Sequence, residues 1–109
     1  MGTTDTWMAL GDATRRGILA RVAQAPSSVT NLARALPISR PAVSQHLQIL
    51  YAAGLVDVRP HGRERIYTAR LDGLDSLRRE LETFWNHALA NFKRIAEADH
   101  DHQHSTEDE

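Results

Sequence analysis

The sequence predicts a mainly α-helical domain that carries one β-hairpin, and three observations support this α+β fold class. Two helical stretches, residues 30–36 and 39–53, are joined by a short turn. Two strand-like runs with alternating polarity follow at 55–59 and 65–69. A long apolar stripe then recurs at helical spacing to the end of a final helix. A helix-turn-helix followed by a hairpin is a winged helix, and 109 residues suffice for one such domain.

The stretch 39–53 predicts the helix around which the domain is organised. Ser39 is a favourable N-cap, Pro41 fits the first turn, and Gly54 supplies a left-handed residue after the end. One face carries the apolar residues and is expected to point inward: Val43, Leu47 and Leu50. The other face has no acidic residue and carries small polar groups that can approach base edges or phosphates: Ser44, Gln45 and Gln48, with Pro41 beside them. The alternative is an ordinary amphipathic helix with a polar exterior.

Three shorter segments precede this helix. Residues 5–10 predict a first helix that is too short to be stable alone, and Asp12 is expected to cap a second helix, 13–25, whose inward residues are Ile18, Leu19 and Val22. Thr30 or Asn31 is expected to cap the third helix, after Val29 as a very short strand or staple. Arg15 and Arg16 either reach a phosphate or form a solvated face with a local ion pair to Asp12, and we favour the second interpretation.

The predicted hairpin is basic. Residues 60–64 form its turn, and the hairpin carries Arg59, His61, Arg63 and Arg65. Basic side chains beside a helix of this kind are suited to contact phosphates or a minor groove. Arg40 can in addition make the bidentate guanine contact that is the most common specific pairing.

Four segments, in this order and spacing, resemble the signatures of the ArsR-type bacterial repressors. They are residues 12–19, 39–47 with Leu50, 53–56, and Gly62-Arg63 with Tyr67, within a resemblance that covers about residues 7 to 96. The resemblance implies a homodimeric winged-helix transcriptional repressor whose dimer is built from the first and last helices. It also implies that Ser39, Arg40, Ser44, Gln45 and His46 lie on or beside the helix that reads DNA.

Composition excludes several other classes. The sequence has no Cys, which removes disulfides and thiolate metal sites, and no apolar run is long enough to span a membrane. No signal-peptide pattern is present, so we expect a cytoplasmic protein. Residues 1–70 carry nine Arg against four acidic residues, a net charge of +5, whereas residues 71–109 carry four basic against ten acidic residues, a net charge of −6. The half expected to bind DNA is therefore the basic half.

The final helix is expected to run from a cap at Asp72 to about Ala98, which is longer than a small domain needs. A long terminal apolar stripe is typical of a dimer contact, although it could pack wholly on its own core. With the family resemblance, we expect long terminal dimerisation helices that hold two copies together through Trp7, Leu10, Leu77, Leu81, Phe84, Trp85, Ala88 and Phe92. Residues 1–98 then form the DNA-binding and dimerisation domain, and 99–109 a disordered acidic tail.

Metal sensing is an alternative that the histidines leave open. His100, His102 and His104 alternate with polar and acidic residues in the tail, and His87 stands alone in the last helix. Many members of the family sense metal through a cysteine pair or through Asp and His on the last helix, and neither pattern is matched here. We therefore assign no metal site and no cofactor, and name these histidines only as candidates.

No catalytic constellation or phosphate loop is present, so an enzyme is not expected. The sequence predicts a homodimeric repressor that binds an inverted-repeat operator through helix 39–53 and the 60–64 wing, with ligand and metal effectors unknown. The alternatives are a metal-responsive derepressor, and a winged-helix module that binds another protein.

Overall fold

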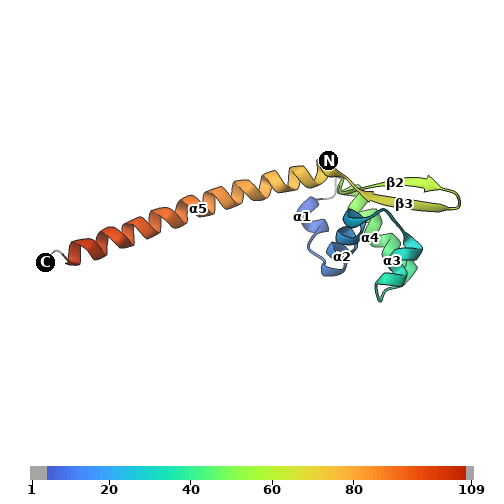
Figure 1. The fold of residues 1–109 in the computed structure, drawn as a ribbon, viewed down its shortest axis with the longest axis horizontal. Helices are drawn as coiled ribbons and strands as arrows, with labels where there is room; N and C mark the ends of the chain where they lie inside the picture. Colours follow the sequence, from blue (N-terminus) through green and yellow to red (C-terminus); the bar gives the residue numbers. More distant parts are fainter. Residues whose placement is uncertain (1–4, 108–109) are drawn as a thin grey trace. The chain divides into compact units, whose positions relative to one another are not determined.

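The computed structural model describes residues 5–107, with the side chains of residues 5–99 (Figure 1). The chain divides after Leu77 into two units, which we call the N-terminal and C-terminal units. The elements, in chain order, are α1 (Thr6–Ala9), α2 (Ala13–Gln24), β1 (Ser27–Ser28), α3 (Val29–Ala35), α4 (Arg40–Ala52), β2 (Val56–His61), β3 (Glu64–Ala69) and α5 (Leu71–Glu107).

The mainly helical winged-helix fold is confirmed, with one addition to the predicted two-stranded hairpin. The sheet has three antiparallel strands in the order β1-β3-β2. The added strand, β1, pairs Ser27 with Tyr67 and Ser28 with Ile66. The hairpin pairs Val58 with Tyr67 and Pro60 with Arg65. The strand β1 therefore ties the start of α3 to the hairpin.

The core of the N-terminal unit lies between the helices and the sheet. Helix α4 packs against both α2 and α3, and β2 packs on α4 (Figure 1). The inward residues predicted for α2 and α4 are all buried, and they meet residues of the other elements: Ala9, Ile18, Leu19, Val22, Leu32, Val43, Leu47, Leu50, Leu55, Val56 and Tyr67. This core fixes the position of α4, which carries the candidate site.

Two helix caps were predicted correctly, and those of α3 and α5 were not. The Asp12 carboxylate accepts a hydrogen bond from the Arg15 N–H at 2.9 Å, and the Ser39 hydroxyl oxygen accepts one from the Ala42 N–H at 3.3 Å. Helix α3, however, is capped by Ser28, whose hydroxyl oxygen accepts from the Asn31 N–H at 3.1 Å, and not by Thr30 or Asn31. The β1–β3 pairing places Ser28 at this position, so the start of α3 depends on a partner distant in the sequence.

The turn of the hairpin is tighter than predicted. The strands extend to His61 and from Glu64, which leaves Gly62 and Arg63 as a two-residue turn in place of residues 60–64. Gly62 has φ +64°, the left-handed conformation that the first position of a type II′ turn requires. The turn therefore places Arg63 at the tip of the wing.

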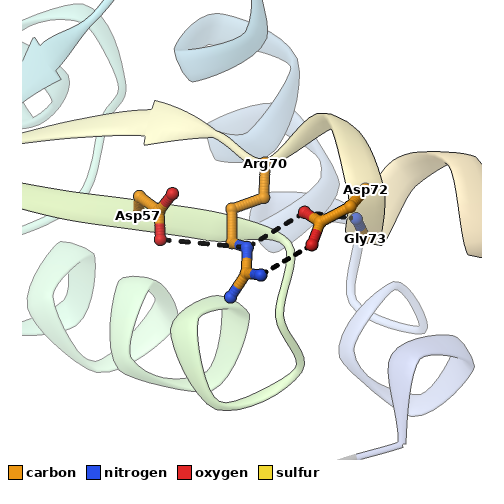
Figure 2. Close-up of polar contacts among 4 residues, drawn as sticks. All are labelled: Asp57, Arg70, Asp72 and Gly73. Atoms are coloured by element: carbon orange, nitrogen blue, oxygen red, sulfur yellow. Dashed lines mark hydrogen bonds and ion pairs between the residues drawn. The ribbon is translucent and has the colours of Figure 1, made fainter.

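The start of α5 is fixed by Arg70, which precedes the helix. Its guanidinium donates to the Asp72 carboxylate at 3.1 and 2.7 Å, and it lies 3.8 Å from the Asp57 carboxylate of β2 (Figure 2). Asp72 was predicted as the cap, and this was wrong: the Arg70 carbonyl accepts the first helical bond from Leu74, and Asp72 lies in the first turn. Helix α5 begins at Leu71, only two residues after β3 ends at Ala69, so the helix has already started before Asp72.

The lengths of the two terminal helices also differ from expectation. Helix α1 has four residues, so the N-terminal helix is not long. Helix α5 continues to Glu107 and does not end near Ala98, so the boundary expected at 98–99 falls inside the described helix. After Gly73 the sequence contains neither Gly nor Pro, and the helix therefore meets no residue that would break it.

Candidate nucleic-acid interface

Helix α4 presents a polar face on the side opposite its buried residues. Arg40, Pro41, Gln45 and Gln48 are exposed, and Ser44 is half-buried. The helix carries no carboxylate, and these residues offer a guanidinium, a hydroxyl and two amides to a partner. These groups match the donors and acceptors on base edges and phosphates.

The hairpin places two arginines beside this face. Arg63 and Arg65 are exposed, at the turn and at the start of β3. Arg65 lies opposite Pro60 in the register, so both side chains point to the sheet face that also carries Val58 and Tyr67. The pairing of the two strands thus places Arg65 on the face of the hairpin where it lines a cleft together with Gln48 of α4.

A cleft of about 550 Å³ joins the helix and the hairpin, and we call it the α4–wing cleft. It brings together six of the ten residues that the sequence predicted to contact DNA: Arg40, Pro41, Ser44, Gln48, Arg63 and Arg65. The lining contains three arginines and one acidic residue, Glu64. A cleft of net positive charge with hydroxyl and amide donors is suited to hold a polyanion.

Five further residues complete the cleft, and sequence analysis did not select them for this role: Ser28, Val29, Thr30, Glu64 and Tyr67. They come from the start of α3 and from β3, which the β1–β3 pairing brings together. The hydroxyl of Thr30 at the first turn of a helix is the one local signal that could have suggested a contact with a phosphate.

Four predicted contact residues do not line the cleft: Ser39, Gln45, His46 and His61. Ser39 caps α4, Gln45 is exposed beside the cleft, and His61 is exposed at the end of β2. Their contact with DNA stays a prediction.

His46 lies on the flank of α4 that faces α2. It is half-buried, and its Nδ1 atom is buried without a hydrogen-bond partner among the described residues. The hydrogen bond from the Arg15 N–H lowers the pKa of Asp12 most strongly, and the nearby charges of His46 and Arg15 lower it further. The structure thus places His46 near the cap of α2.

Arg15 and Arg16 fasten α1 to α2. The Arg15 guanidinium donates to the Ala9 carbonyl at 2.9 Å, and that of Arg16 donates to the Leu10 carbonyl at 2.7 Å. These carbonyls end the short helix, where partial negative charge accumulates. The two arginines therefore have a structural role that neither sequence interpretation included.

The residues predicted for the dimer contact are distributed over α1, its following turn and α5. In the single chain Trp7, Leu81, Phe84, Trp85, Ala88 and Phe92 are exposed. Leu10 is half-buried against the core and Leu77 is half-buried. The exposed members that lie on α5 give that helix an apolar face.

Two further features of the sequence, the candidate metal-binding histidines and the hydropathy of the helices, can be compared with the structure. Among the described side chains no group of three metal-ligating residues exists, and His87 is exposed on α5. His100, His102 and His104 lie outside the residues whose side chains are described. Within residues 5–107 no helix combines the length and hydropathy needed to cross a bilayer.

The fold and the cleft define a winged helix-turn-helix protein with a basic recognition surface. Residues 10–59 match a helix-turn-helix domain family. The chain is 47% identical to the HTH-type transcriptional regulator Rv2034 of Mycobacterium tuberculosis over 95 residues. These aligned residues cover 87% of this chain and 89% of the relative.

Two solved structures are similar throughout the fold. An ArsR-like transcriptional regulator from Rhodococcus sp. RHA1 shares 41% identity, with 83% of this chain and 88% of that chain covered and a TM-score of 0.67. The homodimeric winged helix-turn-helix DNA-binding domain of a possible ArsR-family regulator from Mycobacterium bovis shares 26% identity, with 73% and 74% covered and a TM-score of 0.61. This chain belongs to the ArsR family of winged-helix transcriptional regulators.

Proposed function

We propose that the protein is a homodimeric repressor that binds an inverted-repeat operator and blocks a promoter by occupying it. The observation that carries this proposal is the α4–wing cleft, in which Arg40, Ser44 and Gln48 of the helix meet Arg63 and Arg65 of the hairpin. The helix supplies groups that distinguish base edges in a major groove, and the hairpin supplies charges for the backbone or the minor groove.

The homodimer is supported by two observations. The single chain leaves Leu81, Phe84, Trp85 and Phe92 of α5 more than half exposed, and large contiguous apolar faces in soluble proteins mark contact sites. The Mycobacterium bovis domain that shares this fold is homodimeric. Two-fold symmetry would present two copies of α4, with half-sites about one DNA turn, roughly 34 Å, apart.

The test is a pull-down of genomic DNA from the source organism by the purified protein, followed by sequencing, in parallel with chelator and with added zinc. We expect an inverted repeat to be enriched in both conditions. Enrichment that zinc abolishes would replace this proposal with a metal-responsive derepressor. No enriched sequence in either condition would contradict DNA recognition and favour a protein-binding module.

A control variant makes the pull-down specific to the cleft. Arg40→Ala and Arg63→Ala combined should lose the enrichment, because both guanidinium groups line the cleft. Arg21→Ala removes one positive charge from the exposed last turn of α2, outside the cleft lining, and should keep the enrichment.

A further inference from the structure

A second cavity, of about 430 Å³, lies between α4 and the hairpin, and we call it the α4–hairpin pocket. One wall is a flank of α4, on which intervals of three and four residues place side chains together: Leu47, Gln48 and Tyr51. The other wall is one face of the hairpin, on which Val58 pairs with Tyr67: Val58, Arg65 and Tyr67. Pockets that hold small molecules have volumes of about 300–1,000 Å³, so this pocket is large enough for one.

The pocket adjoins the α4–wing cleft at its polar side. Gln48, Arg65 and Tyr67 line both cavities. The other three residues line the pocket alone: Leu47, Tyr51 and Val58. The polar groups of the pocket therefore belong also to the candidate DNA-binding surface, whereas its apolar side chains lie outside that surface.

The apolar part of the pocket is suited to an aromatic ring. Leu47 is fully buried and Val58 is half-buried, so both provide apolar walls. The rings of Tyr51 and Tyr67 come from the helix wall and the sheet wall, respectively. Aromatic rings attract one another beyond the gain from burial alone, and a phosphodiester makes no use of such walls. The ring system of a small organic molecule fits this part of the pocket better than a DNA backbone does.

The polar part of the pocket is suited to a carboxylate. Arg65 is the one charged residue of the lining. Among the side chains that the structure describes, no carboxylate pairs with its guanidinium. A guanidinium binds a carboxylate through two parallel hydrogen bonds, and the Gln48 amide adds a donor from the helix wall. The lining as a whole therefore matches a molecule with one carboxylate on an aromatic body.

We propose that the α4–hairpin pocket binds a small aromatic carboxylate and that this ligand excludes DNA from the α4–wing cleft. The ring lies between Tyr51 and Tyr67, and the carboxylate accepts hydrogen bonds from Arg65 and Gln48. Because Arg65 and Gln48 line both cavities, the ligand occupies donors that DNA would use. The exclusion is reciprocal, since DNA must weaken ligand binding by the same factor. Ligand binding stands by itself, whereas its effect on DNA rests on the proposed repressor function.

Indole-3-acetate and its uncharged analogue indole-3-acetamide test the ligand class on the full chain without DNA. We expect isothermal titration calorimetry to show one site per chain for the acetate, with a dissociation constant of about 1 mM or tighter for a ligand of about thirteen non-hydrogen atoms. The acetamide should bind at least about tenfold more weakly, because it lacks the charge that pairs with Arg65. No saturable binding of the acetate, or equal binding of the two compounds, would overturn the proposal.

Three variants test where the ligand binds. Tyr51→Ala should weaken acetate binding about fivefold and keep the affinity for DNA, because Tyr51 is exposed and does not line the α4–wing cleft. Arg65→Gln should weaken the binding of both the acetate and DNA. Arg59→Gln is the matched control for the acetate, since Arg59 follows Val58 on β2 and lies on the opposite face of the hairpin.

Two results with these variants would contradict the assigned location. Acetate affinity that Tyr51→Ala leaves unchanged would place the ligand elsewhere on the molecule. A loss of DNA affinity in Tyr51→Ala as large as that in Arg65→Gln would make the pocket a part of the DNA interface and not a separate ligand site.

Fluorescence anisotropy with the operator enriched in the pull-down tests the effect on DNA. With indole-3-acetate at about ten times its dissociation constant, the apparent dissociation constant for the operator should rise at least about tenfold by mass action. An equal concentration of sodium chloride is the control, because DNA binding depends on salt. Unchanged operator affinity with a saturated pocket would overturn the exclusion. A chain that binds the acetate but no DNA would reject the proposed function and leave the ligand site in place.

Discussion

Arg40 and Arg63 line the same cleft but come from different elements, which gives them different roles. Arg40 lies in the first turn of α4, whose backbone is anchored in the core by the buried Val43 and Leu47. Arg63 lies at the exposed tip of a two-residue turn. A guanidinium on a groove-entering helix can select a base, whereas one at the tip of a wing mainly neutralises a phosphate.

Arg40→Ala should therefore reduce specificity. We expect it to weaken binding to the enriched operator by about 1–3 kcal/mol while binding to scrambled DNA changes little. Fluorescence anisotropy titrations on both duplexes measure the ratio. An equal loss on both duplexes would assign Arg40 to the backbone.

Arg63→Ala should weaken binding to every sequence and reduce its salt dependence. Removal of one phosphate contact lowers the slope of log affinity against log salt concentration by about 0.9 per site. The same titrations at several salt concentrations give this slope. An unchanged slope with a changed sequence preference would exchange the roles of the two arginines.

Asp12 links the charge state of a carboxylate to the stability of the N-terminal unit. The Arg15 N–H, which donates to Asp12, holds the pKa of this carboxyl below its ordinary value of 3.8. Since the pKa is lower in the folded state, the carboxylate stabilises the fold fully above the ordinary pKa, and this contribution is lost as the pH falls through the folded value.

Asp12→Asn should accordingly be less stable than the wild type at about pH 6, and the difference should shrink at about pH 3. Asparagine keeps a capping oxygen but does not ionise, which isolates the charge. Urea denaturation at one fixed protein concentration measures both values, because a dimer's stability depends on concentration. A difference that grows at low pH would contradict the sign.

Among the elements, local chemistry made α2 and α4 predictable from the sequence. Asp12 and Ser39 cap the helices that follow them, and the buried face of α4 follows from the spacing of its apolar residues. The start of α3 was not predictable in this way, because the Ser28 cap accompanies a pairing with β3. The same pairing brings Thr30 and Tyr67 into the cleft, which explains why sequence analysis found only part of its lining.

The start of α5 depends on a close approach between two glycines. A Cβ atom on Gly73 would overlap the Gly54 carbonyl, which belongs to the turn after α4. Gly54 itself has φ +77°, a conformation that L-residues rarely adopt. The first turn of α5 therefore tolerates no side chain at this position.

Gly73→Ala should lower the free energy of unfolding by about 1–3 kcal/mol through this overlap. Gly17→Ala is the matched control, since Gly17 also lies in a helix but its added Cβ would meet nothing within 4 Å. The control should raise stability by about 0.5–1 kcal/mol. Equal effects of the two substitutions in urea denaturation would show that the overlap relaxes at no cost.

For the whole molecule, a homodimer that reads an inverted repeat needs two copies of α4 at a fixed distance. The sequence predicted the long apolar stripe of α5 but not how far this helix extends, because no breaking residue marks its end. A rigid homodimer would present its two clefts at one spacing and in one relative orientation. An operator bound in this way must have half-sites on one face of the DNA.

The most direct test of this account is the affinity for an operator whose half-sites are moved apart. Insertion of five base pairs, about half a helical turn, rotates one half-site to the opposite face of the duplex, and insertion of about ten returns it to the same face at a greater distance. We predict that the five-pair insertion reduces affinity to that of scrambled DNA. Affinity that does not change with half-site spacing would contradict a rigid homodimer that reads an inverted repeat.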